Sequence, residues 1–352
     1  MTAAVYYGHH DVRIEQRPVP TPAGDEALLR VTRSGMCGTD ASEWQAGPIM
    51  FPTAKAHPNS GHLGPMVLGH EFIGEIVALG AEVTGFSVGD RVASGAGISC
   101  GTCRRCLENR TNLCANYVTL GLNRDGGMAQ YVAAPVSTLA QIPTGMTDDI
   151  AGLAQPLAVG LHAARRSRVQ PGDSVVIIGS GAIGTFVLAG LLSLGEATVT
   201  VVDFAGPRLE RAQRVGAHHT VGASESTVAD VRAIVGDLGA DVVIEASGAP
   251  NQLSTALSLV KRGGVLLQVG LPTGLQDLDV HKLVMSEITI ETTLAHVCAA
   301  DLAPALHILA TTTLGAELLE SVHPLGEVAA QLEKLATGGI QGKVLFDPTS
   351  RL

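Results

Sequence analysis

Residues 174–184 read SVVIIGSGAIG, and this stretch decides how the second half of the chain folds. Residues 175–178 form the β-branched apolar run that is typical of a buried strand. The glycines at 179, 181 and 184 then match the G-x-G-x-x-G turn that joins a strand to a helix. The first glycine permits the turn, the second lets a pyrophosphate approach the backbone, and the third lets the helix and the strand pack closely.

A dinucleotide is the ligand that this turn predicts, because the free N–H groups and the dipole of the following helix favour phosphate. A second strand over residues 198–202 ends at Asp203, about twenty residues on, where an acid accepts hydrogen bonds from the adenosine ribose. Asp203 would repel a 2′-phosphate, which favours NAD over NADP. Arg208 is expected to stack on the adenine; recruitment of a phosphate by Arg208 and a helix-capping role for Asp203 are the alternatives. The predicted phosphate-binding residues are Gly179, Gly181, Ala182, Ile183 and Gly184.

Helices and strands continue to alternate after Asp203, which predicts an α/β Rossmann domain over residues 156–290. Helices are expected at 228–238 and 253–261, and strands at 241–245, 265–269 and 288–291. Val269, Gly270 and Leu271 lie at the carboxyl end of a strand, where such sheets bind ligands. Two amphipathic helices are expected within 300–340, followed by a strand at 343–346.

The first part of the chain, residues 1–155, reads as short strands without long helices, which predicts a β-rich, barrel-like domain. Residues 47–65 form a long loop with four prolines, and 126–132 read as a further strand. A helix is expected from Asp148 through Leu157, kinked at Pro156. Residues 291–352 should return to this domain to cover its sheet.

Four cysteines lie within fifteen residues of one another, in a lobe at about 96–116. Four thiolates at this spacing predict a closed tetrahedral zinc site that staples the lobe. An iron–sulfur cluster is the competing metal and four unligated thiols are the non-metal alternative. The four residues are Cys100, Cys103, Cys106 and Cys114.

A second metal site is suggested by Cys37, in the segment CGTD, and His70, in the segment GHE. A thiolate and an imidazole from separate segments can bind one zinc ion, and a catalytic zinc keeps one position open. The neighbouring Glu71 can bind the ion transiently or act from behind the ligands. Alone, the pair is weak evidence, because isolated Cys and His residues are more often structural.

Composition narrows the function further. The chain has 352 residues, 46% of them apolar and 16% charged, as expected of a globular protein of two domains. A net charge of −10 and an aromatic content of 3% argue against nucleic-acid binding. The beginning of the sequence lacks a secretory signal, and the uncharged run 174–195 reads as a buried strand and helix rather than a membrane span. A cytoplasmic protein with reduced cysteines is therefore predicted.

Together these motifs, in this order, resemble the zinc-dependent medium-chain dehydrogenase/reductase family of alcohol and polyol dehydrogenases. The segment QPLAV at 155–159 adds to the resemblance, which is strongest to the butanediol, sorbitol and threonine dehydrogenase branch. The resemblance implies a GroES-like catalytic domain joined to the Rossmann domain. It also implies NAD and two zinc ions per chain, one catalytic and one structural.

Residue roles follow from the same resemblance. It implies that Cys37, His70 and the residue at 155 hold the catalytic zinc, while Thr39 relays the substrate proton. Two positions depart from the pattern. The third ligand is Gln155 in place of Glu or Cys, and an uncharged ligand leaves the ion more positive or less firmly held. Ser42 stands where the proton relay often ends in a histidine.

The proton would then leave through Ser42, the cofactor ribose and water, or through His57 or His62 of the long loop if that loop folds inward. The expected reaction is reversible oxidation of a secondary alcohol or vicinal diol, with 2,3-butanediol and acetoin as the first guess. A polyol or threonine-type dehydrogenase is one alternative. If the catalytic zinc is absent, the second alternative is a zinc-independent reductase or an NAD-sensing protein. The resemblance also implies a homo-oligomer, a tetramer or dimer, with residues 275–290 as a possible contact between subunits.

Overall fold

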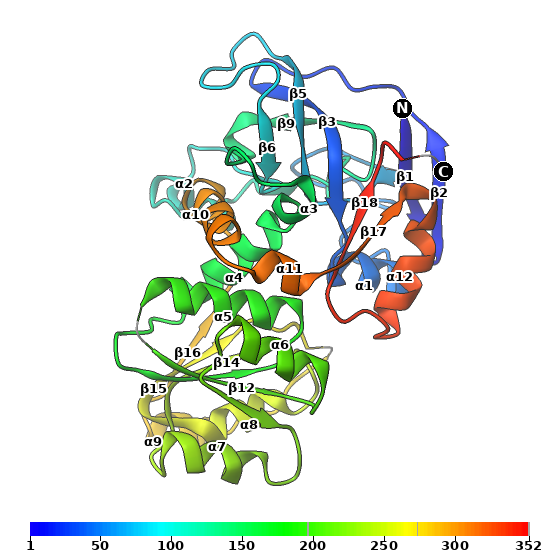
Figure 1. The fold of residues 1–352 in the computed structure, drawn as a ribbon. Helices are drawn as coiled ribbons and strands as arrows, with labels where there is room; N and C mark the ends of the chain where they lie inside the picture. Colours follow the sequence, from blue (N-terminus) through cyan, green and yellow to red (C-terminus); the bar gives the residue numbers. More distant parts are fainter. Residues whose placement is uncertain (196, 273, 351–352) are drawn as a thin grey trace. The chain divides into compact units, whose positions relative to one another are not determined.

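The strand predicted at the start of the glycine-rich turn is present as β11 (Ser174–Ile178) in a computed structural model that describes residues 1–195, 197–272 and 274–350. The chain divides into two units, one made of Met1–Ala158 with His296–Leu352 and the other of Val159–Ala295. Each unit has its own β-strands (Figure 1) and its own hydrophobic core.

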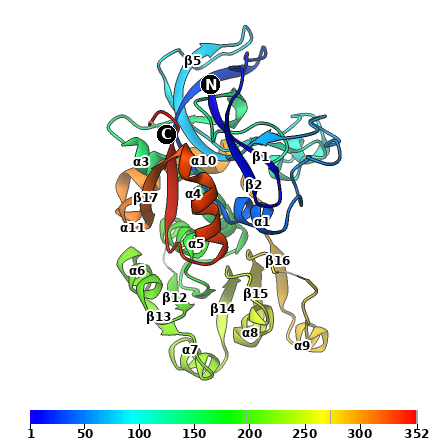
Figure 2. The ribbon, with the colours of Figure 1, turned by 90° about the vertical axis from the view of Figure 1, so that its right-hand side faces the viewer.

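The second unit is built on a parallel sheet in the order β13-β12-β11-β14-β15-β16. Figure 2 shows these strands side by side in that order, apart from β11, which carries no label there. Numbered from β11, the order is 3-2-1-4-5-6, which is that of the Rossmann fold. The other strands are β12 (Thr198–Asp203), β13 (His219–Gly222), β14 (Ala240–Glu245), β15 (Val260–Gln268) and β16 (Thr289–Thr292).

Helices cover both faces of this sheet, because alternate residues of each buried strand point to opposite sides. Val175 and Ile177 pack with Leu188 under α5 and α6, whereas Val176 and Ile178 pack on the side of α7 and α8. The two helix layers are plain in Figure 1. The helices are α5 (Ala182–Leu194), α6 (Pro207–Val215), α7 (Thr227–Val235), α8 (Gln252–Leu259) and α9 (Val280–Met285). The predicted α/β class is thus confirmed.

The first unit is β-rich, with one sheet in the order β10-β6-β5-β3-β18-β17, a strand β9 that also pairs with β3, and a smaller sheet β2-β1-β4. β18 comes from the end of the chain and pairs with the end of β3. The strands are β1 (Thr2–Gly8), β2 (Asp11–Gln16), β3 (Glu26–Gly35), β4 (Met66–Val67), β5 (Glu71–Leu79), β6 (Arg91–Ser94), β7 (Gly97–Ile98), β8 (Val118–Thr119), β9 (Tyr131–Pro135), β10 (Leu139–Gln141), β17 (Leu319–Pro324) and β18 (Lys343–Asp347).

Short helices complete this unit. They are α1 (Gly38–Ala46), α2 (Arg104–Leu107), α3 (Asp148–Ala151), α10 (Cys298–Thr311), α11 (Leu314–Leu318) and α12 (Val328–Ala336), and α4 (Ala154–Arg166) begins here. No helix within the described residues is long and apolar enough to cross a membrane.

Three predicted elements differ from the structure. The single helix through Leu157 is two helices, α3 and α4, and Pro156 causes no kink because it lies in the first turn of α4, where no intrahelical N–H bond is lost. The strand predicted at 126–132 begins only at Tyr131. The region 300–340 contains the unpredicted strand β17, whose polar residues and Pro324 give little apolar alternation.

Candidate metal and dinucleotide sites

The four-cysteine lobe places its sulfur atoms where a single ion would hold them. The Sγ atoms are 3.6 Å apart for Cys103 and Cys106, 3.9 Å for Cys103 and Cys114, and 3.5 Å for Cys100 and Cys114. Four sulfurs at about 2.3 Å from a tetrahedral zinc ion lie roughly 3.8 Å from one another. The cysteines are free thiols, so these spacings fit a metal site and not a disulfide framework.

The second cluster is assembled by strand pairing. β3 and β5 are antiparallel, and the register sets Gly35 opposite Glu71. Cys37 follows the end of β3 as the N-cap of α1, and His70 precedes the start of β5. Ligand atoms of Cys37, His70 and Glu71 consequently lie within 4.8 Å of one another. A Cβ at Gly69 (φ 97°) would lie 2.6 Å from the backbone nitrogen of Met128, so only glycine fits beside His70.

Asp40 organises the cluster, a role that the sequence analysis did not assign to it. The Cys37 N–H donates to Asp40 Oδ2 at 2.9 Å, which fixes the start of α1, and Asp40 Oδ1 lies 3.6 Å from His70 Nδ1. Burial lowers the pKa of His70, but Asp40 and Cys37 together outweigh burial, and the pKa ends above its ordinary value. The spacing C-x-x-D at a helix start was the only signal in the sequence for this residue.

Lys343 is the second residue that the sequence analysis missed. It is 5% exposed, and its Nζ lies 2.6 Å from Glu71 Oε2 and donates to Glu71 Oε1 at 2.8 Å and to the Met36 carbonyl at 2.5 Å. Burial lowers the pKa of Lys343, but Glu71 raises it above its ordinary value, so the ammonium stays charged. Lys343 arrives on β18, about 270 residues after Glu71, and nothing in the local sequence connects the two.

Three further residues of the predicted catalytic site, Thr39, Ser42 and Gln155, differ in their burial and contacts. The half-buried Thr39 has its Oγ1 4.0 Å from Cys37 Sγ. Ser42 is exposed and donates to the Gly38 carbonyl at 3.0 Å, a bond within its own helix. Gln155 is 9% exposed as the second residue of α4.

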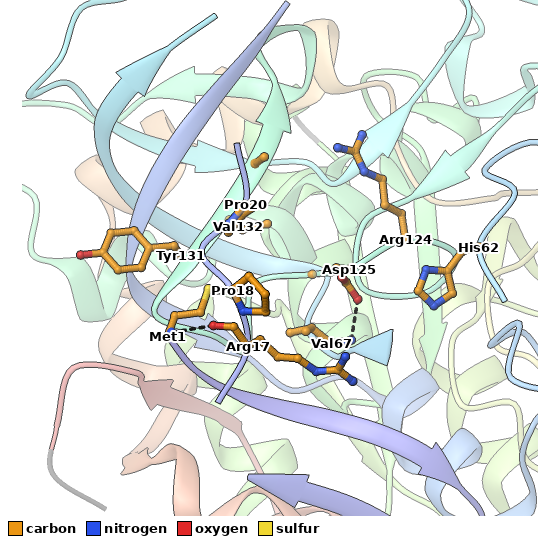
Figure 3. Close-up of a pocket in the computed structure, with 12 residues that line it drawn as sticks. Met1, Arg17, Pro18, Pro20, His62, Val67, Arg124, Asp125, Tyr131 and Val132 are labelled. Carbon is orange, nitrogen blue, oxygen red and sulfur yellow. Dashed lines mark hydrogen bonds between the residues drawn. The ribbon is translucent and has the colours of Figure 1, made fainter. Parts of the chain in front are cut away.

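The loop histidines have local roles. His57 Nδ1 accepts the Ser60 N–H at 3.2 Å, which closes a turn of the loop. His62 lines a cavity of about 440 Å³ (Figure 3). The walls of that cavity include Arg17, Arg124 and Asp125 but none of the Cys37 cluster. The structure thus gives neither histidine a contact with that cluster within the described residues.

A cavity of about 590 Å³ in the second unit adjoins the glycine-rich turn and is lined by Gly179, Gly181, Asp203 and Arg208. A Cβ at Gly184 would lie 1.9 Å from the Gly179 carbonyl oxygen, so this glycine allows α5 to pack on β11. A Cβ at Gly181 would meet no atom of the chain, which leaves the space beside it for a ligand. Ala182 and Ile183 form the first turn of α5, whose N–H groups are free to bind an anion.

Asp203 ends β12 and is 8% exposed at this cavity. Its Oδ2 accepts the Ser180 N–H at 2.6 Å and its Oδ1 accepts the Phe204 N–H at 2.7 Å. These bonds tie the carboxylate to the glycine-rich turn. Asp203 does not cap α6, whose N-cap is Gly206. Val269, Gly270 and Leu271 follow β15 and do not line this cavity.

The chain matches two families along its length: the Alcohol dehydrogenase GroES-like domain over residues 23–144 and the Zinc-binding dehydrogenase family over residues 182–311. It is 38% identical to a sorbitol dehydrogenase of Bacillus subtilis over 78% of this chain and 76% of that protein. It is 34% identical to an L-threonine 3-dehydrogenase of Shewanella woodyi over 78% of each chain. The crystal structure of a 2R,3R-butanediol dehydrogenase from Bacillus subtilis superposes with a TM-score of 0.89, at 26% identity, over 99% of each chain.

The first family match spans both metal-type clusters, and the second begins at residue 182, within the glycine-rich turn. The relatives are more than 30% identical to this chain over more than two thirds of both sequences, so the similarity extends beyond a shared fold. The chain belongs to the zinc-dependent alcohol dehydrogenase family of oxidoreductases, within the medium-chain dehydrogenase/reductase superfamily.

Proposed function

We propose that this chain is an NAD-linked, zinc-dependent dehydrogenase that interconverts a secondary alcohol or vicinal diol and the corresponding ketone. The observation that supports it most is the convergence of Cys37, His70 and Glu71 from separate segments, in a chain that also carries the dinucleotide turn. A soft thiolate, an imidazole and a carboxylate at this spacing suit zinc.

The residues present fit a catalytic ion. Ligand atoms of Cys37, His70 and Glu71 lie within 4.8 Å of one another, and the buried His70 Nδ1 faces Asp40 Oδ1 at 3.6 Å, as expected of a metal-binding imidazole whose other nitrogen faces a carboxylate. Cys37 and His70 would hold the zinc, with the amide oxygen of Gln155 as third ligand and Glu71 able to exchange with it. Cys100, Cys103, Cys106 and Cys114 would hold a second, structural zinc. Bound zinc supplies a Lewis acid for the alcohol oxygen, and NAD supplies the hydride acceptor.

The side chains of the protein orient the ligands and move the proton. Asp40 holds the His70 imidazole and the start of α1, while Lys343 neutralises Glu71. The Thr39 hydroxyl, beside Cys37, accepts the proton released by the alcohol and passes it outward. Ser42, the next hydroxyl along α1, is exposed and would carry the proton on to water.

NAD is favoured over NADP because Asp203 presents a carboxylate at the edge of the cofactor cavity. Arg208 lines the same cavity, and we assign to it the contact with the adenine. The fold also admits NADP: the solved structure of a protein described only provisionally as a zinc-binding dehydrogenase, from Sinorhizobium meliloti, is bound to NADP, at 28% identity and a TM-score of 0.85. The proposal of NAD over NADP therefore depends on Asp203.

The substrate class follows the relatives. The proteins to which this chain is similar are named for sorbitol, threonine and 2,3-butanediol, all of which carry a secondary alcohol. We take 2,3-butanediol and acetoin as the first pair to test. Polyols and threonine are the next candidates.

A homodimer or homotetramer is proposed as the working form. β16 is an edge strand of the parallel sheet, and the segment before it exposes Leu275, Val280, Val284 and Met285. An apolar group of this kind beside an unpaired strand edge is typical of a subunit contact. Light scattering that shows a monomer at micromolar concentration would reject this part of the proposal.

The test of the reaction is NADH formation with a panel of 2,3-butanediol, sorbitol and threonine, with NAD and NADP offered separately. Turnover should fall when a chelator removes zinc and return when zinc is restored. Metal analysis should find about two zinc ions per chain. The absence of metal-dependent turnover of any alcohol would reject the proposal, and about one zinc per chain would favour a zinc-independent reductase.

A further inference from the structure

The carboxylate of Glu245 is buried at the end of β14, and the reaction proposed above does not use it. Glu245 is 1% exposed, and no Lys or Arg lies within ion-pair distance of it among the described residues. A buried carboxylate without a cation is costly unless several donors satisfy it. Its donors come from the loop that follows β14 and from Gln268, the last residue of β15.

The first loop directly follows β14. Glu245 Oε1 accepts the Ser247 N–H at 2.8 Å, the Ser247 hydroxyl, and the Gly248 N–H at 3.0 Å. Ser247 also lines the dinucleotide cavity. On its other side, a Cβ at Gly179 would lie 2.8 Å from the Ser247 backbone nitrogen, so this loop packs against the glycine-rich turn without spare room.

The second loop follows β15. Glu245 Oε2 accepts from Gln268 Nε2 at 2.5 Å, and the same amide donates to the Gly270 carbonyl at 2.8 Å. The backbone carbonyl of Glu245 accepts the Val269 and Gly270 N–H groups at 2.8 Å and 2.9 Å. A Cβ at Gly270 would lie 2.2 Å from the Gly248 nitrogen, so the two loops are in direct contact.

We infer that Glu245 is a positioning residue for the dinucleotide: its carboxylate joins the Ser247–Gly248 loop, through the Gln268 amide, to the Gly270–Leu271 loop at the carboxyl ends of β14 and β15. Ligands of such sheets bind at this edge. Loops that are fixed before binding lose less entropy when the cofactor arrives. The inference rests on the proposed use of NAD and assigns Glu245 no contact with the cofactor itself.

The variant Glu245→Gln tests this inference. The amide has the same shape as the carboxylate, but an N–H donor replaces one of its two accepting oxygens and then faces other N–H donors. The matched control is Asp241→Asn at the opposite end of the same strand. The Asp241 carboxylate accepts the Ser174 N–H at 2.8 Å and the Ser174 hydroxyl at 2.7 Å, far along β14 from the cofactor edge.

Glu245→Gln should weaken NADH binding roughly 10- to 100-fold, since a hydrogen bond of a buried carboxyl group is lost and one of its donors is left without an acceptor. The KM for NAD should rise with it, while kcat changes less than about threefold, because the lost bonds do not touch the reacting atoms. Asp241→Asn should lower the melting temperature and leave NADH affinity unchanged. Gln268→Met, which removes only the bridging amide, should weaken NADH binding by a smaller factor in the same direction; it also keeps the test open if Glu245→Gln does not fold.

Amide hydrogen exchange without cofactor separates this inference from the proposed function. Exchange should quicken in peptides that cover 245–249 and 268–272 of Glu245→Gln, and not in Asp241→Asn. Unchanged exchange in both loops, or equal NADH affinity in Glu245→Gln and Asp241→Asn, would overturn the inference. Failure of the unmodified protein to bind either dinucleotide would instead reject the proposed use of NAD, and with it the role assigned to Glu245.

Discussion

The two candidate zinc sites differ in how the chain brings their ligands together. The four-cysteine site is contained in one segment, and its sulfurs meet because that segment turns back on itself. The Cys37 cluster depends on the pairing of β3 with β5, on the arrival of β18 from the other end of the chain, and on one glycine that admits His70. A local site needs only its own loop, whereas an assembled site needs the whole first unit to be folded.

The two sites also differ in what surrounds the ligands. The ligands of the cysteine lobe are four thiols, a set that is typical of a closed structural zinc site. The assembled cluster is surrounded by charge: Asp40 approaches His70, and Lys343 pairs with Glu71. Partners of this kind orient ligands and set the charge of the ion, which matters for a site that binds substrate. The comparison therefore assigns stability to the first site and chemistry to the second.

The sharpest test of this division is removal of a ligand from the assembled cluster. Cys37→Ser should lose one zinc per chain and reduce kcat/KM about a thousandfold or more, because Lewis-acid stabilisation is worth several kcal/mol. The melting temperature should change little. Metal analysis and steady-state kinetics check both effects.

Cys298→Ser is the matched control for that experiment, since Cys298 belongs to neither cysteine cluster. It should retain both zinc ions and full activity. A Cys37→Ser protein that keeps both ions, or that turns over alcohol at the original rate, would show that the assembled cluster is not the catalytic centre.

The ion pair behind the cluster gives the next largest effect. Lys343→Met leaves the carboxylate of Glu71 buried without a cation, and breaking a buried pair costs about 3–5 kcal/mol of unfolding free energy. Urea denaturation measures the loss. Adding Glu71→Leu should restore most of the stability, since an apolar pair replaces the ionic one. If Lys343→Met unfolds at the same urea concentration as the original protein, the pair is not structural.

The same contrast explains which parts of the molecule the sequence could predict. The Rossmann unit and the four-cysteine lobe follow from contiguous patterns: the strand and turn at 174–184, and four cysteines at short spacing. Cys37 and His70 could be named from their segments, but their meeting depends on strand register. Register is set by long-range pairing, and a single sequence does not reveal it.

The sequence does not predict contacts between residues that lie far apart along the chain. The approach of Asp40 to His70 depends on the exact entry angle of α1, and the bond of Lys343 to Glu71 depends on β18 lying beside β3. The strand β17 was missed for a related reason: it is held mainly by its pairing with β18 and carries polar residues. Propensity is overridden by tertiary pairing at such an edge strand.

A ligand removed from the cysteine lobe should affect stability and not chemistry. Cys103→Ser should lose the other zinc and destabilise the fold by about 3 kcal/mol, which corresponds to a melting temperature lower by roughly 6–12 °C. Activity per folded molecule should stay within about threefold of the original. Calorimetry, metal analysis and kinetics at low temperature test this. A thousandfold loss of activity in fully folded protein would mean that the lobe takes part in the chemistry.

The smallest effect tests Gln155, which stands where the resemblance implies a Glu or a Cys. Gln155→Glu adds a charged ligand, so zinc of the assembled site should leave to a chelator about tenfold more slowly, which corresponds to about 1.4 kcal/mol of added binding. Gln141→Glu, at an exposed position of β10 beside Asp90, adds the same charge outside the Cys37 cluster and should leave the rate of zinc release unchanged. The rate of zinc release to a coloured chelator measures both variants. An equal rate in the two would remove Gln155 from the ligand set and leave Cys37, His70 and Glu71 as the side chains that hold the ion.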